Sequence, residues 1–238
     1  MNVTLFRLSV NLIGVTDTTF ASVCDAVAGA SRRLASMGLV VGTAGNVSCR
    51  SGDAVAVTAT GVRLEHAEAE QVTVVDLDGR PLAGQFAATS ELALHLGIYQ
   101  QHGVGAVVHA HSPQATAASL VLDELPCVHY QMLTLGGSIR VAPFAPFGTD
   151  ALACSVLDAL EGKKAALMAN HGCVAIGETL DAAMENILLL EWACELYLRA
   201  AAAGHPRVLD DDQQQAVVEA AVRQRYGSTR LLDEEERP

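Results

Sequence analysis

The sequence predicts a single α/β domain in which helices flank a mixed, largely antiparallel central sheet. Half of the 238 residues are hydrophobic and only 18% are charged, which suits one sizeable domain with a well-buried core. Strand and helix patterns are interspersed along the chain without a strict strand–helix–strand rhythm, which favours layers around a mixed sheet. Neither a linker-like stretch nor an internal repeat divides the sequence.

The first half of the chain contains both helical and strand patterns. Apolar residues at helical spacing over 18–37, followed by Gly38, predict the first helix. The next segments predict a glycine-rich turn entering a short strand (42–50), an alternating strand (54–61) and a turn between two extended pieces (76–84). After them we expect a helix over 88–102, capped by Thr89 or Ser90 with Glu91 in its first turn. A buried strand (106–111) and a helix with Pro113 in its first turn (112–122) follow.

The second half predicts further helices and one pair of strands. The expected elements are a proline-rich loop and a helix capped by Thr149 (143–162), two strands joined by a tight turn (165–177), a long helix from Thr179 to about residue 203 and a final helix over about 211–225. Residues 1–18 are mildly apolar but include Arg7, so we expect an N-terminal extension rather than a signal peptide. The domain is expected over 19–228, followed by a charged tail over 229–238.

Charge and cysteine content argue against several classes of protein. The formal net charge is −12, from 27 acidic and 15 basic residues, and no basic cluster exists, so we expect no binding to nucleic acid. No apolar run reaches the roughly 18 residues of a membrane-spanning helix, so we expect no membrane partner. The six cysteines form no CxxC pair, which favours free thiols and a cytoplasmic location.

Two histidines stand one residue apart at the end of the strand expected over 106–111. A strand repeats every two residues, so His109 and His111 project from the same face and can offer two nitrogen ligands to one metal ion. The alternative is a pair of solvated polar residues. His171 follows another apolar segment and supplies a third nitrogen, while Gly172 permits a tight turn. Three histidines with an open position are typical of a catalytic zinc site.

A fourth histidine belongs to the helix expected over 88–102. His95 lies four residues after Glu91, so both side chains are on the same helical face. His95 is therefore either a partner of the site or a packed imidazole.

Eight segments occur in the order and spacing of one known family. They are GLVVGTAGNVS (38–48), VTATGV (57–62), VDLDGRPLAG (75–84), TSELALHLGIYQ (89–100), AVVHAHSPQATA (106–117), LPCVHYQM (125–132), APFAPFGT (142–149) and ANHGCVA (169–175). Together they resemble the class II aldolase/adducin family from about residue 20 to about residue 227. Among its members, the chain is most similar to aldolases that act on L-fuculose 1-phosphate. The resemblance implies that 19–228 is a catalytic domain with that family's fold.

The resemblance implies a role for each matching residue. One zinc ion per subunit, or another divalent metal, would be held by His109, His111 and His171. Glu91 would ligate the free metal and would act as acid and base once substrate displaces it. The phosphate-binding positions match Asn46, Thr60, Gly61, Thr89 and Ser90. Tyr130 matches a proton-transferring tyrosine that reaches the adjacent subunit's active site, and Tyr226 matches a mobile tyrosine that closes over the site.

The implied activity is a reversible aldol cleavage. A ketose 1-phosphate resembling L-fuculose 1-phosphate would yield dihydroxyacetone phosphate and a small aldehyde. Such a reaction must stabilise the enediolate left by carbon–carbon scission, which a zinc ion does as a Lewis acid. Hydroxyl, amide and glycine N–H donors at a helix start would hold the phosphate dianion without a basic side chain. The family also implies a homotetramer with active sites at the subunit interfaces.

Other members of the family provide alternatives. Ribulose-phosphate 4-epimerases usually carry aspartate at the position of Glu91, and phosphotetronate decarboxylases tend to carry lysine at the position of Ser90. Methylthioribulose-phosphate dehydratases share the scaffold, and adducin-like modules keep the fold without metal or catalysis. The three histidines together with Glu91 favour an enzyme over an interaction module. The segments ATSE, ATG and APFAPFGT depart from the family's more usual PSSE, PTG or PSG, and APYATFGT.

Overall fold

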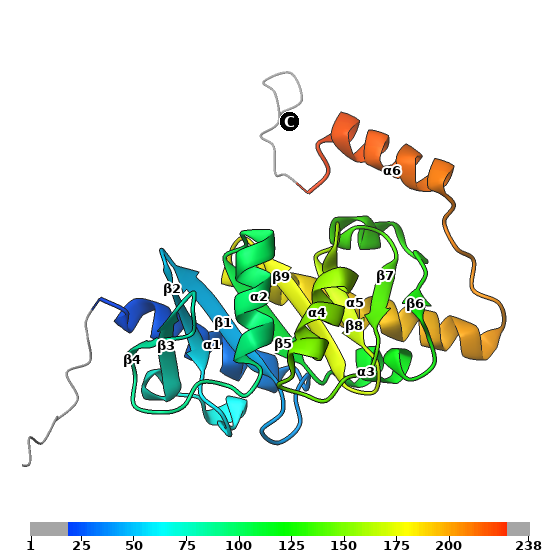
Figure 1. Ribbon diagram of the computed structural model, residues 1–238. Helices are drawn as coiled ribbons and strands as arrows, with labels where there is room; N and C mark the ends of the chain where they lie inside the picture. Colours follow the sequence, from blue (N-terminus) through cyan, green and yellow to red (C-terminus); the bar gives the residue numbers. More distant parts are fainter. Residues whose placement is uncertain (1–18, 228–238) are drawn as a thin grey trace, which may run out of the picture.

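A mixed sheet lies at the centre of the fold (Figure 1). Residues 19–227 are described by this structure, a computed structural model. In that range the strands lie in the order β4-β3-β2-β1-β5-β9-β8-β7-β6. Their bounds are β1 (Asn46–Ser51), β2 (Ala54–Thr58), β3 (Val72–Asp76), β4 (Pro81–Ala83), β5 (Ala106–Ala110), β6 (Glu124–Leu125), β7 (Ile139–Ala142), β8 (Ala165–Met168) and β9 (Gly172–Gly177). The strands pair antiparallel except for β7 with β8, which confirms the expected mixed, largely antiparallel sheet.

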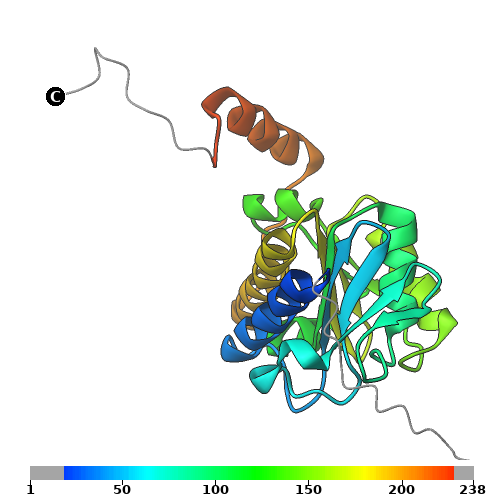
Figure 2. The same ribbon diagram turned by 90° about the vertical axis from the view of Figure 1, so that its left-hand side faces the viewer.

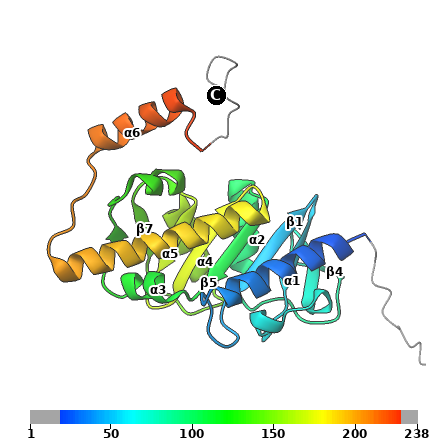
Figure 3. The same cartoon turned by 180° about the vertical axis from the view of Figure 1, so that it is seen from behind.

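Helices cover both faces of the sheet (Figures 2 and 3). The helices are α1 (Ala21–Ser36), α2 (Leu92–His102), α3 (Pro113–Ser119), α4 (Asp150–Leu160), α5 (Leu180–Ala203) and α6 (Asp211–Gln224), with short 3-10 turns at η1 (Leu64–His66), η2 (Ala69–Gln71) and η3 (Tyr130–Leu135). Side chains of α1, α3 and α5 share one buried cluster with the sheet, and those of α2 and α4 share a second cluster on the opposite face. The result is a three-layer α/β/α domain.

Strand β5 lies between β1 and β9 and is buried along its whole length. Its register places His109 opposite Asn46 on β1 and opposite Val174 on β9. Val107 belongs to the cluster shared with α2 and α4, and His109, two residues further on, faces the same layer. The functional side chains at this end of the sheet are therefore between β5 and α2.

Most helix boundaries agree with the sequence patterns, but the start of α2 does not. The expected cap, Thr89 or Ser90, is wrong, because Glu91 is the N-cap residue and no side-chain cap bond is present. The backbone N–H of Thr89 donates to the carbonyl of Thr58 at 3.1 Å, and Ala88 forms a β-bridge with Ala59. This pairing keeps the segment extended beside β2, so the helix begins only at Leu92.

The remaining predicted caps are confirmed. Thr149 Oγ1 accepts the backbone N–H of Leu152, and Thr179 Oγ1 accepts that of Ala182. Helix α6 also agrees with the expected 211–225, but it contains no buried residue and projects from the body (Figures 1 and 3). Strands β6 and β7 were not anticipated from the sequence. The expected N-terminal extension over 1–18 and tail over 229–238 lie outside the described residues.

Within residues 19–227, no helix combines the length and the apolar character that crossing a membrane requires.

Helix α3, which follows the two histidines of the 106–115 segment, is capped by a residue from another helix. Its N-cap residue Ser112 makes no side-chain cap bond. Instead, the carboxylate of Glu191 on α5 accepts the backbone N–H groups of Gln114 at 2.9 Å and Ala115 at 2.8 Å. A carboxylate in this position satisfies two otherwise free donors and favours the positive end of the helix dipole.

We expect Glu191→Ala to lower the free energy of unfolding by about 1–2 kcal/mol, because two charge-assisted cap bonds are lost. Glu195→Ala, one turn further along α5, removes only an exposed ion pair with Arg199 and should change stability by less than about 0.5 kcal/mol. Urea denaturation of both variants measures the difference. Equal effects of the two substitutions would contradict the capping role.

Candidate active site

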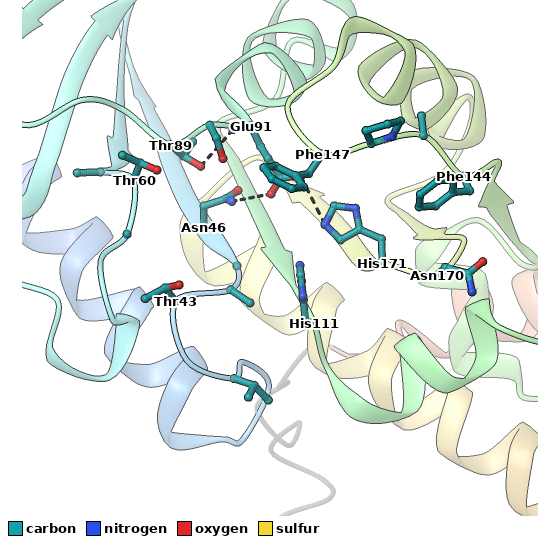
Figure 4. Close-up of a pocket in the computed structure, with 18 residues that line it drawn as sticks. Thr43, Asn46, Thr60, Thr89, Glu91, His111, Phe144, Phe147, Asn170 and His171 are labelled. Carbon is teal, nitrogen blue, oxygen red and sulfur yellow. Dashed lines mark hydrogen bonds and ion pairs between the residues drawn. The ribbon is translucent and has the colours of Figure 1, made fainter.

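Three histidine side chains converge at one end of the sheet. His109 is the fourth residue of β5, His111 follows the end of that strand, and His171 lies in the turn between β8 and β9. Their ligand nitrogens all lie within 4.8 Å of one another, and Nε2 of His109 is 3.1 Å from Nε2 of His111. Figure 4 shows His111 and His171 pointing into the same space. The structure therefore brings together the three predicted metal ligands.

The turn that carries His171 has a strict backbone requirement. Asn170 has a φ of +57°, a left-handed conformation that asparagine tolerates better than most residues. A Cβ atom at Gly172 would lie 2.4 Å from the carbonyl oxygen of Ala110, so only glycine fits there. This close approach brings His171 beside the end of β5.

The surroundings orient His109 and lower the pKa of His111 and His171. Nδ1 of His109 donates to the carbonyl of Cys173 at 2.9 Å, which leaves the lone pair of Nε2 facing the centre of the group. Burial, together with the neighbouring His109 and His171, lowers the pKa of His111 to about 4. Burial and His109 also lower the pKa of His171. Three imidazole nitrogens that face one another in this way are well suited to a shared cation.

Glu91 completes the group at the start of α2. Its Oε2 accepts from Nδ2 of Asn46 at 2.9 Å and lies 3.1 Å from Nε2 of His109. Burial disfavours the charged carboxylate, but the neighbouring His109, the hydrogen bond from Asn46 and the proximity of His171 outweigh it, so the pKa of Glu91 is well below its usual range. Oε1 is buried without a hydrogen-bond partner, 3.6 Å from Nε2 of His171.

These observations fit a divalent metal ion. Three imidazole nitrogens and one carboxylate form a donor set that zinc and its neighbours bind, and the unpartnered Oε1 of Glu91 is a further available ligand atom. The nearby thiol of Cys173 contacts Ser112 and the carbonyl of Ala110 instead. Burial raises the pKa of Cys173 to about 12, so it stays a neutral thiol rather than a ligand.

A cavity of about 640 Å³ opens beside the histidines. One wall carries hydroxyl groups, and another carries aromatic and apolar side chains (Figure 4). The lining residues are Val41, Thr43, Ala44, Gly45, Asn46, Ala59, Thr60, Gly61, Thr89, Ser90, Glu91, His111, Phe144, Ala145, Pro146, Phe147, Asn170 and His171. This lining contains no lysine or arginine. An anion bound here must therefore be held by hydroxyl and amide donors or by a metal.

The five positions matched to phosphate binding all line this cavity. Two chain segments contribute most of them, and the Ala59–Ala88 bridge holds these segments side by side. The backbone N–H of Thr60 also donates to the carbonyl of Ala87 at 3.0 Å. The side chain of Asn46, by contrast, is engaged with Glu91.

Two of the predicted residues are not at the cavity. Tyr130 and Tyr226 are 41% and 62% exposed, and neither is among the residues that line the pocket. Their hydroxyl groups lie 3.2 Å apart, so the structure brings these two tyrosines together at a separate place on the chain.

Some residues of the cavity were not predicted from the sequence. Thr43 and Asn170 line it, and each belongs to a turn next to a predicted site residue. The signal that could have found them is the glycine-rich turn GTAGN and the turn ANHG. Their contribution depends on where the two turns meet, which is a property of the sheet register.

Comparisons with known proteins identify the family. A model of the class II aldolase and adducin N-terminal domain matches residues 25–198. The chain belongs to this family. The 5-methylthioribulose-1-phosphate/5-deoxyribulose-1-phosphate aldolase of Rhodospirillum rubrum is 35% identical over 192 residues, which cover 80% of this chain and 86% of that protein. The L-fuculose phosphate aldolase of Escherichia coli (strain K12) is 36% identical over 184 residues, covering 76% of this chain and 85% of that protein.

The structural comparison agrees with the sequence comparison. A solved structure of L-fuculose 1-phosphate aldolase matches with a TM-score of 0.81 and 30% identity, covering 84% of this chain and 96% of that chain. Class II aldolases are metal-dependent lyases, so this member of the family is an enzyme of the aldehyde-lyase class. The group of three histidines can hold the metal that this class requires.

We expect His111→Ala to lower the metal content of this class II aldolase to a small fraction of one ion per subunit, because one of three nitrogen ligands is lost. His66→Ala is the control, since that side chain is 79% exposed and lies outside the site. Elemental analysis of dialysed protein measures both variants. If His111→Ala retains as much metal as His66→Ala, the proposed ligand set is wrong.

Proposed function

We propose that this enzyme is a zinc-dependent aldolase. It reversibly cleaves a ketose 1-phosphate resembling L-fuculose 1-phosphate into dihydroxyacetone phosphate and a small aldehyde. The observation that carries the proposal is the convergence of three imidazole nitrogens and the unpartnered Oε1 of Glu91 at a cavity with one hydroxyl-lined wall. Neutral imidazoles with an open coordination position are the usual ligands of catalytic zinc, which favours this metal.

The hydroxyl-lined wall suits the phosphate group. Thr43, Thr60 and Ser90 line it together with Gly61, whose φ of +75° requires glycine. A phosphate dianion in such a site is held by neutral hydrogen-bond donors, because no basic side chain lines the cavity. This fits a chain with a net charge of −12, which would otherwise repel an anionic substrate.

The apolar wall suits the aldehyde end of the substrate. Phe144 and Phe147 line the cavity and are 65% and 70% exposed, so their surfaces are available to a bound molecule. One relative is named for 5-methylthioribulose 1-phosphate and 5-deoxyribulose 1-phosphate, and another for L-fuculose phosphate. Each of these ketoses ends in a methyl or methylthio group. We therefore propose a substrate that ends in a methyl or thioether group rather than in a hydroxyl group.

The reaction transfers one proton from oxygen to carbon. The C4 hydroxyl loses its proton as C4 becomes the aldehyde carbonyl, and the electron pair of the C3–C4 bond stays with the three-carbon fragment. In the synthetic direction the carboxylate of Glu91 removes the C3 proton through Oε1, the oxygen without a hydrogen bond. In the cleavage direction Glu91 returns a proton to C3, and the proton released by the C4 hydroxyl balances it. A bound divalent metal supplies Lewis-acid stabilisation of the negative charge that develops on the substrate oxygens.

We also propose that the active site is completed by an adjacent copy of the chain. Tyr130 and Tyr226 are paired with each other at an exposed position and do not line their own cavity. In a cyclic homotetramer, head-to-tail interfaces place the same surface of one subunit against the active site of the next. Tyr130 would then exchange the C4 hydroxyl proton, and Tyr226 would cover the bound substrate.

A cytoplasmic location is part of the same proposal. All six cysteines are free, and the thiols of Cys127, Cys173 and Cys194 are buried. Unpaired buried thiols are typical of proteins in a reducing compartment.

The direct test is release of dihydroxyacetone phosphate from candidate ketose 1-phosphates. We expect turnover of L-fuculose 1-phosphate, 5-deoxyribulose 1-phosphate or 5-methylthioribulose 1-phosphate, with loss of activity after chelation and recovery on adding zinc. A coupled assay for dihydroxyacetone phosphate measures each substrate. Release of carbon dioxide or epimerised sugar instead would contradict the proposal and would favour one of the other family activities.

The shared site predicts complementation between two inactive variants. His111→Ala lacks the metal ligand and Tyr130→Phe lacks the proton-transferring hydroxyl, so each homo-oligomer should be nearly inactive. Mixed oligomers, formed by unfolding and refolding the two together, contain interfaces that pair an intact metal site with an intact tyrosine. Activity should then return in part, as measured against each parent refolded alone. Inactive mixed oligomers of confirmed composition would show that the site is not shared.

A further inference from the structure

A line of polar side chains runs from Glu91 into the core between α2 and β1. Nδ2 of Asn46 donates to Oε2 of Glu91 at 2.9 Å, and Oδ1 of Asn46 contacts Nε2 of His95. Nδ1 of His95 lies 2.6 Å from Oγ of Ser48, and that oxygen lies 2.7 Å from the hydroxyl of Tyr99. Five side chains thus form one continuous chain of hydrogen bonds.

The spacing of these residues follows from the two elements that carry them. Glu91, His95 and Tyr99 stand four residues apart, so they share one face of α2 and its cap, about 6 Å from one to the next. Asn46 and Ser48 stand two residues apart on β1 and share one face of the strand, about 6.6 Å apart. Because the two repeats nearly match, the chain alternates regularly between helix and strand.

The donors in this chain all point toward Glu91. An ionised carboxylate only accepts, so the amide of Asn46 must turn its NH₂ group to Glu91 and its oxygen to His95. Nε2 of His95 must then carry the proton, which leaves Nδ1 to accept from Ser48. The hydroxyl of Ser48 is thereby used as a donor, so its oxygen accepts from Tyr99. Each hydrogen bond fixes the direction of the next.

The deep end of the chain is isolated from solvent. Ser48 and His95 are 0% exposed and Tyr99 is 1% exposed, and the tyrosine belongs to the apolar cluster under α2 and α4. Burial and the nearby His109 lower the pKa of His95 to about 3, although Glu91 opposes the shift, so the imidazole is neutral. Burial raises the pKa of Tyr99, which keeps its hydroxyl protonated as a donor. Nothing in solution competes for these groups.

We propose that Tyr99, Ser48 and His95 are positioning residues that act through Asn46 to hold the carboxylate of Glu91 in its working orientation. The chain engages Oε2 and leaves Oε1 without a hydrogen bond, facing the histidines and the cavity. Oε1 is the oxygen that exchanges a proton with the substrate carbon in the proposed reaction. Its orientation depends on the hydrogen bond that holds Oε2. Asn46 serves this chain as well as lining the cavity. The inference rests on the proposed function of Glu91 as acid and base.

The first test isolates the proton transfer of Glu91. Exchange of the C3 proton of dihydroxyacetone phosphate with deuterated solvent needs no aldehyde, and NMR follows it. We expect Tyr99→Phe and Ser48→Ala, with metal bound, each to slow exchange by about tenfold or more with KM changed less than about twofold, because the carboxylate is misdirected while phosphate binding is retained. Glu91→Gln, which lacks the carboxylate, gives the background exchange rate of the assay. Tyr197→Phe, a change of the same size on α5 outside the chain, should exchange like the wild type.

The second test reads the hydrogen-bond direction and does not depend on activity. In protein labelled with ¹⁵N-histidine, long-range ¹H–¹⁵N spectra distinguish the two neutral tautomers, and His95→Gln assigns the signals of His95. The wild-type protein should show His95 protonated at Nε2 only. Asn46→Ala, which removes the acceptor of Nε2, should introduce the Nδ1-protonated form, while Tyr197→Phe should not. If His95 only packs in the core, Asn46→Ala should leave its tautomer unchanged.

The outcomes separate the two proposals. A wild-type His95 protonated at Nδ1 overturns the positioning chain, as does wild-type exchange in folded Tyr99→Phe and Ser48→Ala. A larger effect on KM than on the exchange rate also overturns it, because it indicates a role in substrate binding. A wild-type enzyme that fails to exchange dihydroxyacetone phosphate overturns the proposed function instead, and the tautomer of His95 still decides whether the chain is directed as described.

Discussion

The active site depends on the pairing of β5 with a different neighbour on each side. β1 on one side places Asn46 opposite His109, and β9 on the other begins at Gly172, beside the turn that carries His171. A shift of either pairing by one residue would turn a ligand to the opposite face of the sheet. The close approach of Gly172 to the backbone of Ala110 fixes this register at the point where the ligands meet. The metal site is therefore set by the same contacts that hold the centre of the sheet together.

The electrostatics of the site follow from this arrangement. The chain is strongly acidic and the cavity lining has no lysine or arginine, yet the proposed substrate is an anionic sugar phosphate. A metal ion held by the three imidazoles would supply positive charge at one end of the cavity. In the proposed site hydroxyl and backbone donors would hold the phosphate, and the Ala59–Ala88 bridge holds together the two segments that carry most of them. Among the residues that line the cavity, Glu91 is the one acidic side chain, and no lysine or arginine accompanies it. The proposed reaction therefore depends on where its carboxylate lies.

Holding a carboxylate in place at the edge of an apolar core has a structural cost. A buried polar group destabilises the fold unless its hydrogen bonds are satisfied, and a chain of such groups is stable only when every member has a partner. Between α2 and β1 this condition is met from Asn46 to Tyr99. The same packing that buries α2 against the sheet thus restricts the rotation of the Glu91 side chain. The stability of the fold and the orientation of the Glu91 carboxylate therefore depend on the same set of contacts.

The sequence by itself determined the fold class and the family, and it predicted the three histidines that the structure brings together. These depend on local patterns: the period of two that puts His109 and His111 on one face, and the glycine beside His171. It also indicated that His95 shares a face with Glu91, although it left the partner and packing interpretations open. The cap of α2 was predicted incorrectly, because the residues before it pair with β2, and no local pattern records that pairing. Only the tertiary structure decided that Asn46 contacts Glu91, that Ser48 and Tyr99 extend this contact into the core, and that Tyr130 and Tyr226 lie away from their own cavity. These facts depend on the register between strands and on the packing of one helix against them, and such long-range pairings have no signature within a short window of sequence.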